Sequence, residues 1–183
     1  MGSRHVLLAL LAGLVVAGAL LGGCGKEIGD SCTLASDCSP NGDRICQCSN
    51  CSGTDPTGDS SHGYCTIQGC DFGTCPSEAV CVRFFTGSFD NPPGKMCGPN
   101  VPAEQQVICS PDELCSLTGN CVPRSSEIRY CMKTCDSGGD CRGDDGYECR
   151  DLALMMQHGG EPVPAPDTAL DPNHLQKFCA ARP

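Results

Sequence analysis

The chain has 183 residues, including 19 cysteines, 14 prolines and 23 glycines, and its formal net charge is -10. From position 24 onward only 23 residues are Leu, Ile, Val or Phe, a share below the roughly 20 % under which highly charged chains are usually disordered. These numbers exclude a Rossmann fold, a barrel enzyme and a helical bundle. They also exclude nucleic acid as a partner, because a surface that binds nucleic acid is basic. The chain therefore folds only with covalent support from its cysteines.

The N-terminal segment has the pattern of an export signal. Arg4 and the terminal amine are positively charged, and residues 6–21 form a continuous apolar stretch that includes two glycines. This stretch is shorter than the about 20 residues of a membrane-spanning helix. Small residues follow it, as they do before the cleavage site of a signal peptide. We predict a signal peptide over residues 1–23, with an uncleaved membrane helix as the alternative.

The sequence Leu21-Gly22-Gly23-Cys24 resembles the lipobox of bacterial lipoproteins. The resemblance implies that Cys24 carries a diacylglycerol thioether and an N-acyl chain such as palmitate, and that residues 24–31 form a lipidated tether. More than one acyl chain holds a protein stably at a membrane. By the same resemblance, Gly25 in place of an aspartate implies sorting to the outer membrane. The alternative is an ordinary signal peptide, cleaved near Gly23, that leaves Cys24 for a disulfide.

The other cysteines predict a disulfide framework. Setting Cys24 aside leaves an even number, 18, which can close as nine disulfides. An exported chain meets an oxidising compartment in which disulfides persist, and each disulfide typically contributes about 2–4 kcal/mol to stability. The predicted disulfide cysteines are Cys32, Cys38, Cys46, Cys48, Cys51, Cys65, Cys70, Cys75, Cys81, Cys97, Cys109, Cys115, Cys121, Cys131, Cys135, Cys141, Cys149 and Cys179.

Two stretches of the chain repeat one cysteine spacing. Cys32-x5-Cys38-x7-Cys46 matches Cys135-x5-Cys141-x7-Cys149, and each has an aspartate directly before its middle cysteine. A second alignment, of residues 64–81 with residues 130–149, matches Tyr64-Cys65, Cys70, Cys75 and Cys81 with Tyr130-Cys131, Cys135, Cys141 and Cys149. These repeats predict knotted modules within residues 32–97 and 98–150. The staggered pairs that we predict are Cys65–Cys75 with Cys70–Cys81, and Cys131–Cys141 with Cys135–Cys149.

Secondary structure is predicted to be short. Ala79–Phe85 alternates apolar residues on one face, which predicts a strand, and residues 147–150 predict the corresponding strand of the second module. Residues 86–107 contain Asn-Pro-Pro-Gly and Gly-Pro turns and predict a connecting loop. The sequence Ser110-Pro111-Asp112-Glu113 has the capping residues of a single helical turn.

The C-terminal tail, residues 151–183, is predicted to combine a short helix with an extended segment. Leu152–Met156 favours the helix, and the proline-rich stretch Gly159–Pro166 favours extended chain. Cys179 is expected to link the tail to the body. The fold expected is thus a small disulfide-rich protein of tandem knotted modules, with short β-hairpins, single helical turns and little regular secondary structure.

The cysteine pattern also resembles a known class of repeats. Cys131-x3-Cys135-x5-Cys141-x7-Cys149 is similar to cysteine-rich repeats, often likened to the Dickkopf N-terminal region, in outer-membrane lipoproteins of gliding, predatory Gram-negative bacteria. The resemblance covers residues 32–150 in two or three copies and implies a role in surface gliding or cell contact. The lipobox and the cluster Cys46-x-Cys48-x2-Cys51 depart from the animal modules, so a Wnt-antagonist function is not implied.

The densest group of thiols contains residue types that can bind zinc or take part in redox chemistry. Cys46, Cys48, Cys51 and His62 are residue types that bind zinc, but only Cys48-x2-Cys51 has the spacing of a zinc module. A thioredoxin-like role for that pair would need a strand-to-helix junction, which the sequence does not predict. We therefore predict disulfides at these cysteines and no metal.

Other short patterns are expected to have structural roles. Four acids resemble calcium ligands, but their order breaks the alternation of an EF-hand loop, so solvated turn acids are expected. An Arg-Gly-Asp tripeptide is expected to be accidental, and two Gly-Asp-Ser sequences lack the apolar strand that precedes an esterase serine. The residues concerned are Asp140, Asp144, Asp145 and Glu148; Arg142-Gly143-Asp144; and Gly29-Asp30-Ser31 and Gly58-Asp59-Ser60.

The sequence therefore predicts a non-enzymatic protein with no cofactor and no catalytic residue. Its lipid would hold it at the outer membrane, on the periplasmic or the cell-surface side, where disulfide-stabilised modules bind an envelope or surface protein. The alternatives are a protease inhibitor that uses Phe84-Phe85 or the 86–96 loop, and a structural spacer of the envelope.

Overall fold

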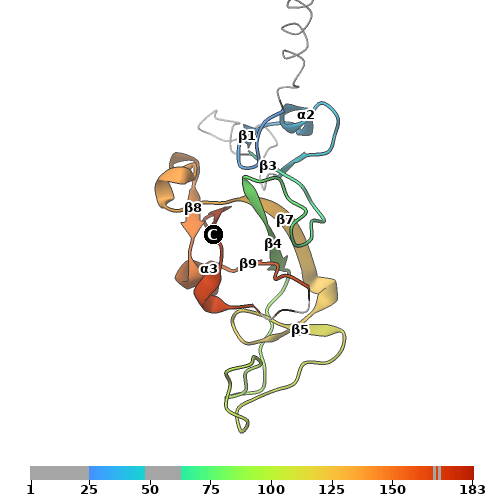
Figure 1. The fold of residues 1–183 in the computed structure, drawn as a ribbon, viewed down its shortest axis with the longest axis vertical. Helices are drawn as coiled ribbons and strands as arrows, with labels where there is room; N and C mark the ends of the chain where they lie inside the picture. Colours follow the sequence, from blue (N-terminus) through green and yellow to red (C-terminus); the bar gives the residue numbers. More distant parts are fainter. Residues whose placement is uncertain (1–24, 48–62, 167, 169) are drawn as a thin grey trace, which may run out of the picture.

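The computed structural model describes residues 25–47, 63–166, 168 and 170–183. The chain is elongated, and Figure 1 shows three levels along its longest axis. The first described residues lie at one end with α2, the main sheet and the C-terminal strands lie in the middle, and the hairpin that contains β5 lies at the other end. None of the helices in this described part of the chain is long and apolar enough to cross a membrane.

Among the described residues, one arrangement of two disulfides occurs four times, and we call it the double-disulfide unit. In each unit the first cysteine is bonded to the third and the second to the fourth, while the third and fourth lie directly opposite each other on paired antiparallel strands. The eight disulfides between described cysteines are Cys32–Cys46 and Cys38–Cys65 in unit 1, Cys70–Cys81 and Cys75–Cys131 in unit 2, Cys97–Cys115 and Cys109–Cys121 in unit 3, and Cys135–Cys149 and Cys141–Cys179 in unit 4.

Unit 1 contains the short helix α2 (Ala35–Cys38) and a three-stranded sheet. The sheet has the order β1-β3-β2, with β1 at Ser31–Cys32, β2 at Ile45–Gln47 and β3 at Gly63–Thr66. Asp37 caps the turn that begins α2, because its carboxylate accepts the backbone N–H groups of Thr33 and Leu34 at 2.8 and 2.9 Å.

Unit 2 forms the central sheet of the molecule. Strand β4 (Ala79–Phe85) pairs along its whole length with β7 (Glu127–Lys133), and the short β9 (Glu161–Pro162) pairs with the other edge of β4. Cys75 belongs to the first predicted module, residues 32–97, and Cys131 belongs to the second, residues 98–150. Their disulfide therefore joins the two modules to each other.

Unit 3 is inserted into unit 2, between the strands β4 and β7. It consists of the hairpin β5 (Glu113–Cys115) and β6 (Cys121–Pro123), together with the preceding loop. The 3-10 turn η2 (Arg124–Ser126) leads directly from β6 into β7. Unit 3 therefore projects from the end of the central sheet (Figure 1).

Unit 4 closes the C-terminal part of the chain. Its strands are β8 (Tyr147–Arg150) and β10 (Phe178–Ala181), and its helix is α3 (Leu152–His158). Three 3-10 turns complete it: η3 (Gly138–Asp140), η4 (Gly143–Asp145) and η5 (Pro172–His174). The carboxylate of Asp140 accepts N–H groups from Asp136 and Ser137, so it has in unit 4 the role that Asp37 has in unit 1.

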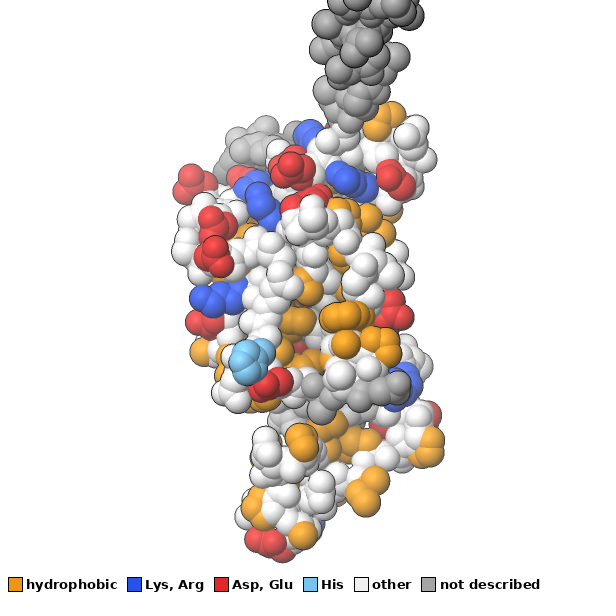
Figure 2. Space-filling view, in the orientation of Figure 1, with side chains coloured by type: hydrophobic (Ala, Val, Ile, Leu, Met, Phe, Trp, Pro, Cys, Tyr) orange, Lys and Arg blue, Asp and Glu red, His pale blue; other side chains and the backbone are white. Residues whose placement is uncertain are grey.

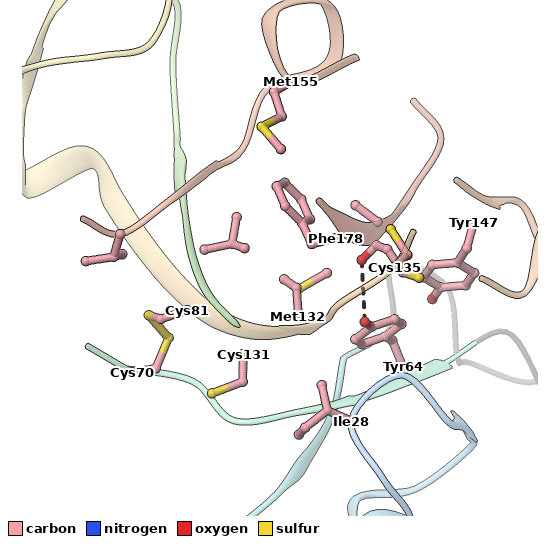
Figure 3. Close-up of a cluster of buried hydrophobic side chains, with 14 residues drawn as sticks. Ile28, Tyr64, Cys70, Cys81, Cys131, Met132, Cys135, Tyr147, Met155 and Phe178 are labelled. Carbon is pink, nitrogen blue, oxygen red and sulfur yellow. Dashed lines mark hydrogen bonds between the residues drawn. A yellow bond between two sulfur atoms is a disulfide. The ribbon is translucent and has the colours of Figure 1, made fainter. Parts of the chain in front are cut away.

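The main core combines a few large apolar side chains with cystine sulfur. Five of its 14 buried residues are cysteines, and the side chains of Ile28, Val82 and Phe178 are completely buried. Figure 3 shows Phe178 between Met155 and Met132, with the Cys70–Cys81 disulfide in the same cluster. Sulfur thus supplies the buried apolar volume that the composition lacks.

Two of the four predicted disulfide pairs are correct. Cys70–Cys81 and Cys135–Cys149 are confirmed, as is the link from Cys179 to the body. The pairs Cys65–Cys75 and Cys131–Cys141 are wrong. In each unit the second cysteine is instead bonded to the fourth cysteine, which lies opposite the third on the paired strand. The fourth cysteine follows the second by 12 to 56 residues in the sequence. Spacing within a short segment does not identify such a partner.

The predicted elements are mostly confirmed. The strands at 79–85 and 147–150 have the expected bounds, residues 86–107 are a loop with one isolated bridge, and the helix begins at Leu152 but continues to His158. The helical turn at Ser110 is wrong. Glu113 makes the expected contacts with Ser110, but the chain continues as β5 because Glu113–Cys115 pairs with β6. The small disulfide-rich fold itself is confirmed.

Candidate functional site: a cleft lined by arginines

Part of the predicted chemistry lies outside the described residues. This holds for the lipidation residue Cys24, for Cys48, Cys51 and His62, and for the Gly58-Asp59-Ser60 sequence. Cys46 is described, and its sulfur is bonded to Cys32, so it is not a thiolate ligand in this structure. All 16 described cysteines are paired.

Three of the four acids that were expected to be solvated turn residues make contacts within the protein, and one of these, Glu148, lies in the strand β8 and not in a turn. The fourth, Asp144, is exposed. The N–H groups of Ser137 and Asp136 lower the pKa of Asp140, and Asp145 forms an ion pair with Arg142. Glu148 lies between Arg150 and His158, at 3.1 and 2.6 Å. Burial opposes ionisation of Glu148, but the hydrogen bonds from His158 and Arg150 prevail and lower its pKa. These carboxylates stabilise turns and strand ends.

Arg142, the first residue of the Arg-Gly-Asp tripeptide, connects unit 4 to unit 1. Its guanidinium donates hydrogen bonds to the carbonyl oxygens of Gly29 and Gly63, at 3.0 and 2.7 Å. The group also lies 4.5 Å from the ring centroid of Tyr147, which stacks on Tyr64 with 5.1 Å between the centroids. The guanidinium of Arg142 is therefore occupied by contacts within the protein.

A cleft of about 690 Å³ lies between unit 3 and the central sheet. Its apolar wall includes Met96, Val101, Leu114, Leu117 and Val163. Figure 2 shows hydrophobic side chains gathered where the lower lobe joins the body of the molecule. The volume lies within the range of about 300–1,000 Å³ that is typical of ligand pockets.

Three arginines form the opposite, polar wall of the cleft. Arg83 of β4 and Arg129 of β7 lie directly opposite each other in the register of the two strands. Arg124, in η2, lies just before β7 and is exposed. Asp71 supplies the one acidic side chain among the described residues that line the cleft.

Acidic partners hold two of these arginines in place. Glu161 accepts from Nε of Arg83 at 2.7 Å, and it also accepts the N–H group of Leu117, which joins unit 3 to the sheet. Burial raises the pKa of Glu161, and the charge of Arg83 opposes that rise. Arg129 is bonded to Glu127 at 2.6 Å and to Asp71 at 2.9 Å, and Glu127 is the main cause of a raised pKa at Arg129.

Sequence reasoning did not identify this cleft. Arg83, Arg124 and Arg129 are isolated basic residues in an acidic chain, and the register of β4 with β7 brings them together. No motif or spacing marks such a set. Arginine and carboxylate form bidentate, charge-assisted hydrogen bonds, so this wall has the chemistry to hold a carboxylate beside an apolar surface.

Comparisons with known proteins add no relative. No protein family, no curated protein and no solved structure matches this chain.

Proposed function

We propose that the chain is a non-enzymatic, lipid-anchored protein of the bacterial outer membrane that presents rigid disulfide-stabilised modules to another protein, in cell contact or surface gliding. The observation that carries the proposal is the complete pairing of the 16 described cysteines. Disulfides of this density belong to oxidising compartments, which is where the predicted export signal and lipobox would direct the chain.

The layout of the molecule is consistent with a tether at one end. The chain just after Cys24 lies beside α2, because the N–H group of Lys26 donates to the carbonyl of Cys38 at the end of that helix. Helix α2 and unit 3 lie at opposite ends of the molecule (Figure 1). A lipid on Cys24 would therefore hold the cleft and unit 3 away from the bilayer. With a net charge of -10 the protein is not attracted to an anionic bilayer, so the tether alone would hold it there.

Two tests address the anchor and the interaction separately. Cys24→Ala should move the protein from the detergent phase to the aqueous phase on phase partition, and retention in the detergent phase would contradict the anchor. Photo-crosslinking in cells, with a photoreactive residue at the partly exposed Val101 or at the exposed Met156, should capture one discrete protein. A structural spacer would instead give no specific product at any position.

A protease inhibitor remains the second candidate, and the 86–96 loop is the segment that favours it. Most of the loop is exposed, and Asn91 fixes it to unit 3: its Nδ2 donates to the carbonyl of Gly119 at 2.7 Å, and its Oδ1 accepts the N–H of Cys121 at 2.9 Å. Phe84 instead packs against the buried Phe178 of β10, with the ring centroids 6.3 Å apart. Stoichiometric inhibition of a protease, abolished by Asn91→Ala, would establish this function.

A further inference from the structure

We infer that the cleft between unit 3 and the central sheet binds an extended peptide segment of the partner protein, one that carries apolar side chains and a carboxylate. The inference rests on the proposed function and names the chemistry of the partner. It is carried by the unpaired guanidinium of Arg124, by the exposed ion pair of Arg129 with Asp71 and by the composition of the walls.

One cationic group of the cleft is not neutralised by the protein. Glu161 forms an ion pair with Arg83, and Glu127 and Asp71 form ion pairs with Arg129. Arg124 also lines the cleft, and it has no such partner among the residues that the structure describes. In a chain with 22 acidic residues and 12 lysines and arginines, an unpaired cation attracts an anionic group to that place.

The arrangement of the arginines is unfavourable for the sheet by itself. Arg83 and Arg129 face each other across β4 and β7, and like charges at directly opposite positions destabilise an antiparallel pair. The fold compensates with Glu161 on Arg83 and with Glu127 on Arg129. Because these glutamates neutralise both guanidinium groups, a ligand carboxylate would bind chiefly through Arg124.

Two of the guanidinium groups are accessible to such a ligand. Arg124 is exposed, and its guanidinium has no hydrogen-bond or ion-pair partner among the residues that the structure describes. Arg129 also contacts Asp71, but the Asp71 side chain is 70 % exposed. An exposed ion pair is worth little, so an incoming carboxylate can compete with Asp71 for Arg129 as well as bind Arg124.

The remaining walls favour a peptide over a simple acid. Val163–Pro166 lines the cleft with prolines at alternate positions, Pro164 and Pro166. Since proline has no N–H group, this segment offers mainly carbonyl acceptors to a ligand. A peptide supplies N–H donors for those carbonyls, apolar side chains for the surface around Leu114 and a carboxylate for the arginines, whereas a fatty acid lacks the donors.

The test is a selection of phage-displayed random octapeptides on the full chain, oxidised and purified in detergent. Selected peptides should combine apolar residues with Asp or Glu, and a synthetic copy should bind about tenfold or more weakly to Arg124→Glu, a loss typical of a broken charge-assisted contact. Arg182→Glu makes the same charge change at an exposed residue outside the cleft, and it should bind as the parent does. Unchanged disulfide maps would show that both variants fold.

Three results would overturn the inference. The first is a selection that enriches no peptide, or peptides without an acidic residue. The second is equal binding by Arg124→Glu and the parent chain. The third is competition by sodium octanoate at the same concentration as the peptide, because the cleft would then be a site for small amphipathic anions.

Crosslinking separates a failure of this inference from a failure of the proposed function. If a photoreactive residue at Val101, which lines the cleft, captures nothing while one at Met156 on α3 captures a partner, the protein binds a partner through another surface and only the cleft assignment is wrong. If neither position yields a product in cells, the proposed function fails as well.

Discussion

Arg142→Ala tests how the first and fourth double-disulfide units are held together. The guanidinium donates to the carbonyls of Gly29 and Gly63, and both glycines are buried. A buried acceptor that loses its donor costs about 1–3 kcal/mol, which gives about 2–6 kcal/mol for the two. Water can reach part of the space that the shortened side chain leaves, so we expect the free energy of unfolding to fall by about 2–4 kcal/mol.

The assay is guanidinium chloride unfolding with the disulfides intact, followed by circular dichroism. Arg142→Lys keeps the charge but not the planar fork, so it should recover only part of the loss. Arg182→Ala is the matched control, because its Nη2 makes one long contact of 3.5 Å with the carbonyl of Tyr147. If Arg142→Ala lost less than about 1 kcal/mol, within the range of ordinary surface substitutions, Arg142 would not connect the units in the way described.

Three further changes test the core, the buried ion pair and the acid response. Phe178→Ala should lower the free energy of unfolding by about 3–5 kcal/mol, because the ring is completely buried and its removal leaves a cavity; a loss below about 1 kcal/mol in the same unfolding assay would contradict the packing. Glu161→Gln should cost about 3–5 kcal/mol by leaving the charge of Arg83 buried without its partner, and an unchanged midpoint of denaturation would refute this. Backbone N–H groups lower the pKa of Asp140 in the folded chain from its usual 3.8, so its stabilisation is fully present above that value and is lost as the pH falls through the folded pKa. Asp140→Asn should therefore reduce the drop in melting temperature on acidification, and equal drops in parent and variant would show that Asp140 contributes nothing to it.

The sequence predicted local structure well and distant pairing poorly. The alternation in Ala79–Phe85 is a property of seven neighbouring residues, and the strand formed with those bounds. The bond between the first and third cysteines of units 2 and 4 spans 11 and 14 residues and was also predicted correctly. The partner of Cys75 lies 56 residues away, beyond an inserted unit, and only the pairing of β4 with β7 identifies it.

The candidate site was not predictable for a related reason. Arg83 and Arg129 are separated by the whole of unit 3, and the strand register places them opposite each other. Arg124 reaches the same cleft because η2 connects β6 directly to β7. The repeated aspartates Asp37 and Asp140 share a role that their spacing did not reveal: each carboxylate accepts two backbone N–H groups at an equivalent turn.

The central claim is that four double-disulfide units replace the apolar core that this chain lacks. The most direct measurement is a disulfide map of the native protein by partial reduction, alkylation and mass spectrometry. We predict first-to-third and second-to-fourth pairing in every unit, including Cys75–Cys131 and Cys141–Cys179. Free thiols at these positions, or local pairs such as Cys65–Cys75, would contradict the claim.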